Sequence, residues 1–146
     1  MKTKIFFFSL ILLATTVSTS AQTDADRDAV KRVAMSYAEG WYEGDAAKME
    51  SALSPQLAKR IARSSEKGES TLGQMTSTDL IDATRGGLGK KTPAIEQRKD
   101  VKIFDMMANS ATVKLEMRDW VDYMHIARMN GKWVIVNVLW EMKSKK

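Results

Sequence analysis

The stretch that decides the fold runs from Trp120 to Met142 and reads WVDYMHIARM, NG, KWVIVNVLWEM. Two runs rich in β-branched and aromatic residues flank the dipeptide Asn130-Gly131. Asn-Gly between two such runs is the strongest short-range signal for a β-hairpin, because both central residues of a type I′ turn need a positive φ. The stretch therefore predicts an antiparallel hairpin closed by a two-residue turn.

The turn also predicts which side chains share a face of this hairpin. A two-residue loop pairs Met129 with Lys132, and the other pairs follow in step. Since alternate residues of a strand point to opposite faces, Asp122 and His125 are not expected to form a direct acid–base pair. One predicted face carries Trp120, Asp122, Met124, Ile126, Trp133, Ile135, Asn137 and Leu139, and the other carries Val121, Tyr123, His125, Ala127, Val134, Val136, Val138 and Trp140.

Both predicted faces of the hairpin are mostly apolar. A sheet that is apolar on both sides is normally covered on both sides. We expect helices to cover one face, and either a lid over an internal cavity or a second copy of the chain to cover the other. The pattern thus predicts a homodimer that forms through the sheet.

The residues before the hairpin also have a two-residue period. Residues 111–118 alternate apolar and polar side chains, and Val101 and Ile103 alternate with charged residues before a turn at Asn109-Ser110. Such alternation is typical of half-buried strands. The C-terminal half is therefore predicted to contain four antiparallel strands.

The N-terminal half has the period of a helix instead. Apolar residues recur at spacings of three and four over residues 24–43, and Gly44 is expected to end that helix. A second helix is predicted from Asp45 and a third from residues 76–79, whereas residues 56–75 fit either a hairpin or irregular structure. Helices segregated from strands indicate an α+β fold rather than alternating βαβ units.

Residues 1–21 have the three parts of a secretory signal peptide. Lys2 and Lys4 precede an apolar run over residues 5–17, and small residues end at Ala21. The run is shorter than the ~20 residues of an ordinary membrane span. We therefore expect residues 1–21 to be cleaved and residues 22–146 to form one exported domain, periplasmic or secreted, without a further membrane span.

Composition and charge exclude several classes of protein. The 146 residues are 44% hydrophobic and 28% charged, which excludes a wholly disordered chain. The chain has no cysteine and one histidine, so neither a thiolate nor a histidine-rich metal site is expected, and no cofactor is predicted. The net charge of +5 is scattered among acidic residues, which disfavours nucleic-acid binding.

Parts of the sequence resemble a known family. Residues 120–125 (WVDYMH) and 131–140 (GKWVIVNVLW) resemble the C-terminal signature of the putative lumazine-binding family, which belongs to the nuclear transport factor 2-like (SnoaL-like) superfamily. The resemblance covers essentially the whole predicted mature chain. In the N-terminal half it rests on Tyr37, Trp41, Gly44-Asp45 and Leu53-Ser54-Pro55.

This resemblance implies a cone in which three N-terminal helices pack on a curved antiparallel sheet. Such cones usually enclose a pocket between the first helix and the concave face of the sheet, and they often dimerise through the sheet. The superfamily includes isomerases, cyclases, dehydratases and many binders without catalytic activity. A shared fold does not identify a reaction, so the resemblance leaves the activity open.

The candidate ligand-binding residues combine aromatic area with a few polar groups, as flat heteroaromatic ligands require. Asp122 stands out as a carboxylate on an apolar face, where it is either a base with a raised pKa or a carboxylate satisfied by Asn137 or by a helix N-terminus. The aromatic residues and His125 also fit purely structural roles. The predicted ligand-binding set is Tyr37, Trp41, Asp122, Tyr123, His125, Asn137 and Trp140.

Three functional hypotheses follow from the sequence. The leading one is an exported domain that binds a small planar or apolar molecule and has no catalytic machinery. The second is a small-substrate enzyme of isomerase or cyclase type, with Asp122 as the base and Tyr123 or His125 as the proton donor. The third is a structural or interaction domain whose pocket is filled by its own side chains.

Overall fold

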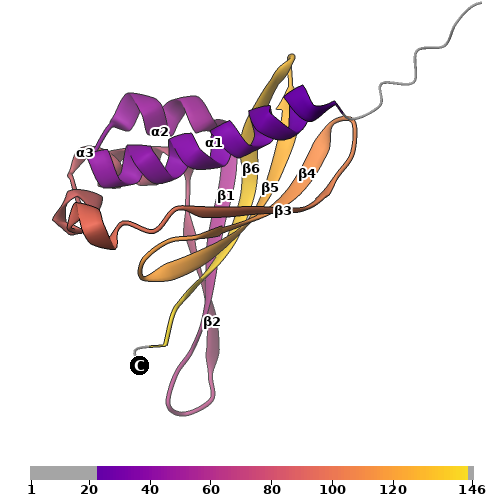
Figure 1. Cartoon of the computed structure of the whole chain (residues 1–146). Helices are drawn as coiled ribbons and strands as arrows, with labels where there is room; N and C mark the ends of the chain where they lie inside the picture. The colour runs from indigo at the N-terminus through magenta and orange to yellow at the C-terminus, as the bar shows by residue number, and fades with distance from the viewer. Residues whose placement is uncertain (1–22, 145–146) are drawn as a thin grey trace, which may run out of the picture.

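The structure is a computed structural model that describes residues 23–144, so the predicted export signal lies outside the described residues. Figure 1 shows three helices together on one side of a curved sheet. In chain order the elements are α1 (Asp24–Glu43), α2 (Ala46–Ala52), β1 (Leu53–Ser64), β2 (Ser70–Met75), α3 (Ser77–Arg85), two 3-10 turns (Gly89–Lys91 and Ala94–Glu96), β3 (Asp100–Met106), β4 (Ser110–Glu116), β5 (Trp120–Met129) and β6 (Lys132–Met142).

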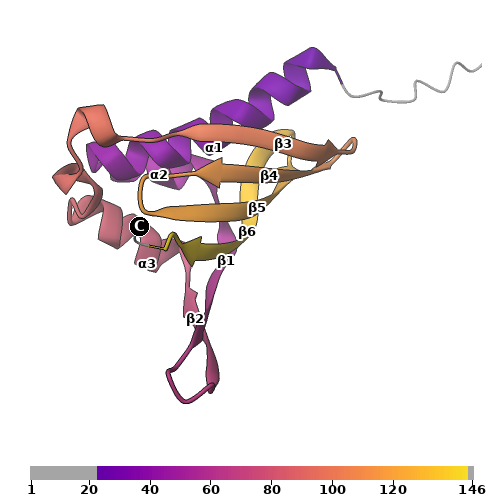
Figure 2. The same cartoon turned by 60° about the horizontal axis from the view of Figure 1, so that its bottom comes forward.

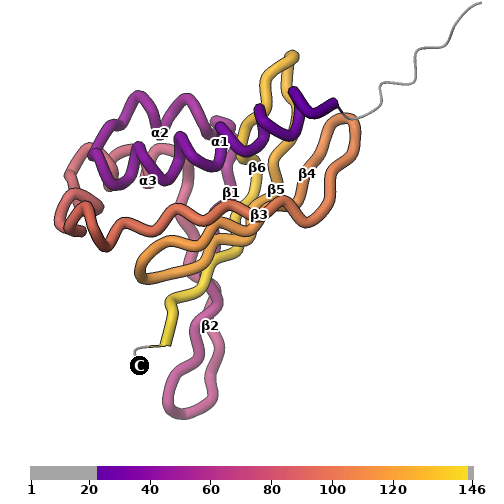
Figure 3. The backbone as a smooth tube through the Cα atoms, in the orientation of Figure 1, coloured from indigo at the N-terminus to yellow at the C-terminus, as the bar shows by residue number. Residues whose placement is uncertain are grey.

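The six strands form one mixed sheet in the order β2-β1-β6-β5-β4-β3. Strand β1 runs parallel to β6, and the other neighbours are antiparallel. Figure 2 shows β3, β4 and β5 side by side, and in Figure 3 the β1–β2 hairpin projects beyond the rest of the sheet.

One detail of the predicted architecture is wrong. The sheet is not wholly antiparallel, because β1 enters it beside β6 as a parallel strand. The order of the elements agrees with the prediction, with β1 and β2 between α2 and α3. Alternation within a segment shows that it is a strand but does not specify which distant strand it pairs with. Of the two options for residues 56–75, the hairpin is the one observed.

The helix boundaries follow local capping chemistry. The Thr23 hydroxyl accepts a hydrogen bond from the Asp26 N–H (3.2 Å), and Gly44 ends α1 in the left-handed region with φ 66°. The Asp45 carboxylate caps α2 by accepting from the Lys48 N–H (2.9 Å). These caps confirm the predicted extent of α1 and the start of α2. Helix α2 ends at Ala52, because Leu53 already belongs to β1.

The β5–β6 turn forms as the sequence predicts, with φ 50° at Asn130 and 78° at Gly131. The predicted register holds from Met129↔Lys132 to the pair Ile126↔Ile135. A β-bulge then shifts the register by one residue. An extra residue in one strand is not visible in the alternation of a sequence, so the prediction misses it.

Because of the bulge, the residues in the second half of β6 point to the faces opposite to those predicted. Asp122 pairs with Trp140, and both face the helices, on what we call the inner face of the sheet. Asn137 instead joins Tyr123 and His125 on the outer face. The predicted grouping of Asp122 with Asn137, and of Trp140 with Tyr123 and His125, is therefore wrong.

The core lies between the helices and the inner face. Many of its fully buried apolar side chains come from α1, α2, β4, β5 and β6; among them are Val30, Ala34, Met49, Val113, Leu115, Met124, Ile126, Ile135 and Val138. The N-terminal end of α1 is fixed to the β5–β6 hairpin, because Asp26 pairs with Arg128 and also lies 3.4 Å from Trp133 Nε1. Within residues 23–144, no helix combines the length and the hydropathy that a membrane crossing requires.

Candidate functional site

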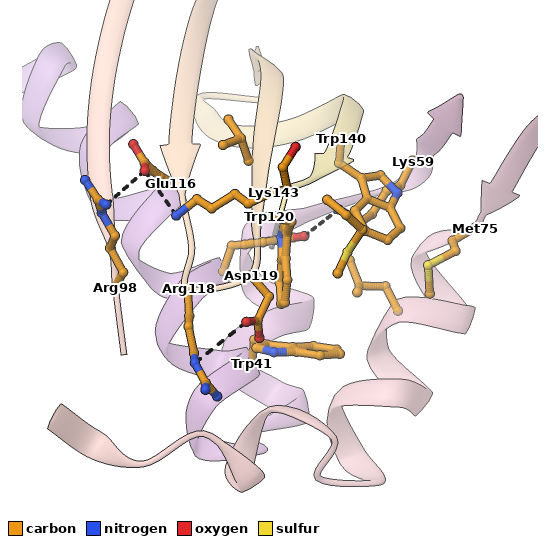
Figure 4. Close-up of a pocket in the computed structure, with 15 residues that line it drawn as sticks. Trp41, Lys59, Met75, Arg98, Glu116, Arg118, Asp119, Trp120, Trp140 and Lys143 are labelled. Carbon is orange, nitrogen blue, oxygen red and sulfur yellow. Dashed lines mark hydrogen bonds and ion pairs between the residues drawn. The ribbon is translucent and has the colours of Figure 1, made fainter. Parts of the chain in front are cut away.

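A cavity of about 940 Å³ opens where the C-terminal half of α1 meets the middle of β1, the start of β5 and the end of β6. Figure 4 shows its lining side chains. Helix α3 closes one side through Leu80, and the segment before β3 contributes Arg98. The lining residues are Tyr37, Trp41, Lys59, Met75, Leu80, Arg98, Glu116, Arg118, Asp119, Trp120, Val121, Trp140, Met142, Lys143 and Ser144.

Three of the four tryptophans of the chain form walls of this cavity. The rings of Trp41 and Trp120 meet edge to face with centroids 5.6 Å apart, and those of Trp120 and Trp140 meet similarly at 6.3 Å. Gly89 packs directly against Trp41, since a Cβ at that position would lie 2.5 Å from the indole Cδ1. The tryptophan rings therefore surround the cavity as a fixed aromatic cage.

One buried polar cluster lies at the floor of the cavity. The Lys59 ammonium donates to the Tyr37 hydroxyl oxygen (2.9 Å) and forms a short ion pair with Asp122. Trp120 Nε1 donates to the second carboxylate oxygen of Asp122 (2.8 Å). Lys59 is 4% exposed and Asp122 is completely buried. We call Tyr37, Lys59 and Asp122 the floor cluster; they come from α1, β1 and β5.

Burial controls the protonation of the floor cluster. Burial lowers the pKa of Lys59, although the neighbouring Asp122 carboxylate acts in the opposite direction. Burial raises the pKa of Tyr37 well above 10.0, and the negative charge of Asp122 adds to that shift. The Tyr37 hydroxyl therefore stays protonated at neutral pH. Each charge of the ion pair compensates the other, as burial of this depth requires.

A second group of charged side chains lies at the mouth of the cavity. Glu116 accepts Arg98 Nη1 and Lys143 Nζ, both at 3.0 Å (Figure 4), and Arg118 pairs with Glu96 at 2.7 Å. The hydrogen bond from Lys143 is the main cause that lowers the pKa of Glu116. Ion pairs this close to water contribute little stability. In the interior of the cavity, the charged side chains are those of the floor cluster.

The structure places three of the predicted ligand-binding residues on the cavity wall: Tyr37, Trp41 and Trp140. Asp122 lies directly behind the lining, where Lys59 and Trp120 satisfy its carboxylate oxygens. The sequence expectation that Asn137 satisfies this carboxylate is wrong, because the bulge turns Asn137 to the other face.

The other three predicted residues lie away from the cavity. Tyr123, His125 and Asn137 are on the outer face, where Asn137 Nδ2 is 3.4 Å from His125 Nδ1. The enzymatic hypothesis needs Asp122 beside Tyr123 or His125. Since these groups point to opposite faces of β5, the structure does not bring the proposed base and donor together.

Sequence reasoning missed Lys59, although the sequence contains a signal for it. Leu57, Lys59 and Ile61 occupy alternate positions of β1, and all three are buried. A lysine within an apolar alternation is unusual and needs a partner inside the protein. The signal does not identify Lys59 on its own, because the sequence of residues 56–75 fits both a hairpin and irregular structure.

The side chains of residues 23–144 contain no group of three or more histidine, aspartate or glutamate residues that could hold a metal ion. The site that the structure describes consists of the aromatic cage, the floor cluster and the charged mouth. Together they provide apolar contact, one buried ammonium donor and a charged entrance.

Comparisons with known proteins agree with this architecture. The family model described as putative lumazine-binding matches residues 25–141. No curated protein matches the chain. Because the solved structures named below are less than 25% identical to this chain, their likeness concerns the fold alone.

An NTF2-like protein of unknown function from Shewanella baltica has a TM-score of 0.65 at 18% identity, covering 86% of this chain and 100% of its own. A second one, from Silicibacter pomeroyi, has a TM-score of 0.65 at 15% identity, with 84% and 100% covered. A ketosteroid isomerase-like protein from Erwinia carotovora atroseptica has a TM-score of 0.54 at 8% identity, with 84% and 100% covered. The fold is therefore nuclear transport factor 2-like.

The floor cluster makes a prediction about stability. Asp122→Asn leaves the Lys59 ammonium without its countercharge, so we expect it to lower the free energy of unfolding by about 3–5 kcal/mol. The double variant Lys59→Met with Asp122→Asn removes both charges and keeps an acceptor for Trp120. We expect it to recover at least about 2 kcal/mol of that loss. Urea unfolding at neutral pH measures both values.

The matched control is Asp82→Asn, which removes the exposed ion pair with Arg85. Its cost should stay below about 1 kcal/mol, as is usual for surface pairs. A double variant no more stable than Asp122→Asn would contradict the assignment of this cost to the uncompensated charge.

Proposed function

The chain belongs to the putative lumazine-binding family, and we propose that it binds a small, flat and largely apolar molecule in the cavity between α1 and the sheet. The observation that carries this proposal is a space of about 940 Å³ bounded by three tryptophans and a single buried polar cluster. Sites for small molecules typically have about 300–1,000 Å³, mostly apolar walls and a few oriented polar groups.

The shape of the cavity supports a planar ligand in particular. Trp41, Trp120 and Trp140 present ring faces and edges at roughly right angles to one another. A flat ring system can stack on one indole while its edge meets the next, which is the preferred geometry of aromatic pairs. Pterins and flavins have this shape, and lumazine is a pterin-type molecule of two fused rings.

The two alternatives from the sequence have less support. A domain with a filled pocket does not need the open space that the described side chains leave. An isomerase or cyclase that uses Asp122 as its base needs a carboxylate that reaches the substrate. Asp122 is completely buried behind the cavity lining, where its two oxygens accept hydrogen bonds from Lys59 and Trp120. We therefore propose binding without catalysis.

We also propose that the domain works outside the cytoplasm and as a homodimer. The support for export is the signal pattern of residues 1–21. The support for a dimer is the outer face of the sheet, where Tyr123, Leu139 and Leu72 are 44%, 49% and 61% exposed. Large apolar side chains grouped on one face are typical of a protein interface.

Binding is tested with lumazine, riboflavin and a sterol as probes, using thermal shift and quenching of tryptophan fluorescence. A ligand at 100 times its dissociation constant should add about 2.7 kcal/mol of stability. Trp41→Ala should weaken binding about tenfold, because it removes one wall of the aromatic cage. His125→Ala is the control on the outer face, and its affinity should be unchanged. Equal weakening by both variants would argue against the cavity as the site.

Export predicts a new N-terminus. When the full chain is expressed in a bacterium, mass spectrometry of the periplasmic fraction should find a protein that begins at Gln22. A protein that stays in the membrane fraction with residues 1–21 intact would instead identify an uncleaved anchor.

Dimerisation predicts a change of sedimentation with a single substitution. Residues 22–146 should sediment as a dimer at high micromolar concentration, and Leu139→Arg should shift them to the monomer by placing a charge on the outer face. Ile95→Arg, at a position that is 95% exposed, is the control and should leave the dimer intact. A monomer at all concentrations would remove this proposal.

A further inference from the structure

Lys59 has more hydrogen-bond donors than the protein uses. An ammonium group carries three N–H donors. Two of them have acceptors, the Tyr37 hydroxyl and the Asp122 carboxylate. Lys59 also lines the cavity while its side chain is 4% exposed. One donor of a deeply buried charged group is therefore left for a molecule in the cavity.

The carboxylate of Asp122 lies behind the lining of the cavity. Asp122 is completely buried and is not one of the lining residues, and its two oxygens accept from Lys59 and Trp120 Nε1. The ammonium of Lys59, which does line the cavity, donates and cannot accept. A ligand that presents an N–H or O–H group to Lys59 therefore finds no acceptor there. A ligand that presents an acceptor gives the third N–H of Lys59 a partner.

The net charge of the floor cluster restricts which kind of acceptor group a ligand can place there. Lys59 and Asp122 compensate each other, so the floor cluster has no net charge to offer an anion. A carboxylate brought to this depth would be an uncompensated buried charge, which is costly. A neutral carbonyl oxygen gains the hydrogen bond without that cost.

We infer that the floor of the cavity is a subsite for a neutral carbonyl oxygen on the edge of a flat ligand, with Lys59 Nζ as the donor. The inference rests on the proposed function and specifies its ligand class. The oxygen lies beside the indole of Trp140, because Lys59 Nζ is 4.8 Å from the centre of that ring. The fused rings behind the oxygen then lie among the tryptophans.

The experiment compares two probes that have the same fused bicyclic ring system. 1-Indanone differs from indane by a carbonyl group in place of one methylene group. An apolar cavity without a donor prefers indane, because indane is the more hydrophobic of the two. We expect the protein to bind 1-indanone about tenfold more tightly than indane in isothermal titration calorimetry. Indane-2-carboxylate, which carries a charge, should bind more weakly than 1-indanone.

Variants assign the preference to Lys59. The double variant Lys59→Met with Asp122→Asn removes the donor without leaving a buried charge, and it should bind indane at least as tightly as 1-indanone. Lys143→Met is the matched control, since it removes a lysine at the mouth of the same cavity. It should keep the preference for the ketone.

The outcomes separate the two proposals. Equal affinity for the two probes in the unaltered protein, or a preference that survives in the double variant, overturns the inference and leaves the proposed function standing. Tighter binding of the carboxylate overturns the requirement for a neutral group. If no flat compound binds, including lumazine and riboflavin, the proposed function fails and this inference fails with it.

Discussion

The ion pair between Lys59 and Asp122 is the constraint on which the rest of the site depends. It joins β1 to β5 across the intervening strand β6, and the Tyr37 hydroxyl adds α1 to the same cluster. Two charges at this depth are stable only while both remain and their other hydrogen bonds are satisfied. The pair therefore fixes the relative position of a helix and two non-adjacent strands, and the open space lies above that fixed point.

The β-bulge in β6 is the second constraint, and it determines the composition of the walls. Beyond the bulge, Trp140 faces the cavity and pairs with Asp122, whereas Asn137 and Leu139 face outward. A strand without the extra residue would place Asn137 and Leu139 inside and Trp140 outside. A shift of one residue in the register of β6 thus places the indole of Trp140 on the inner face and the amide of Asn137 on the outer face. The aromatic cage depends on this shift.

The sequence predicts those parts of the fold that are controlled locally. The Thr23 cap and Gly44 define α1, and Asn130-Gly131 defines the β5–β6 turn, because caps and turns act over a few residues. The bulge, the parallel pairing of β1 with β6 and the contact between Lys59 and Asp122 depend on residues far apart in the chain. Alternation alone contains no information about such pairings, and for this reason the sequence does not predict the central lysine of the site. The predicted residues that do line the cavity are Tyr37, Trp41 and Trp140.

Among residues 23–144, the two charged side chains that are buried on the inner face are the two that meet there. Lys59 interrupts a buried alternation in β1, and Asp122 interrupts one in β5. Departures from an otherwise consistent pattern concentrate where a protein has a function to perform. A lysine and an aspartate at such positions in different strands have opposite charges and each needs a partner, so their contact is the arrangement with the lowest cost. The donor that Lys59 retains after this pairing is what the core leaves available to a ligand.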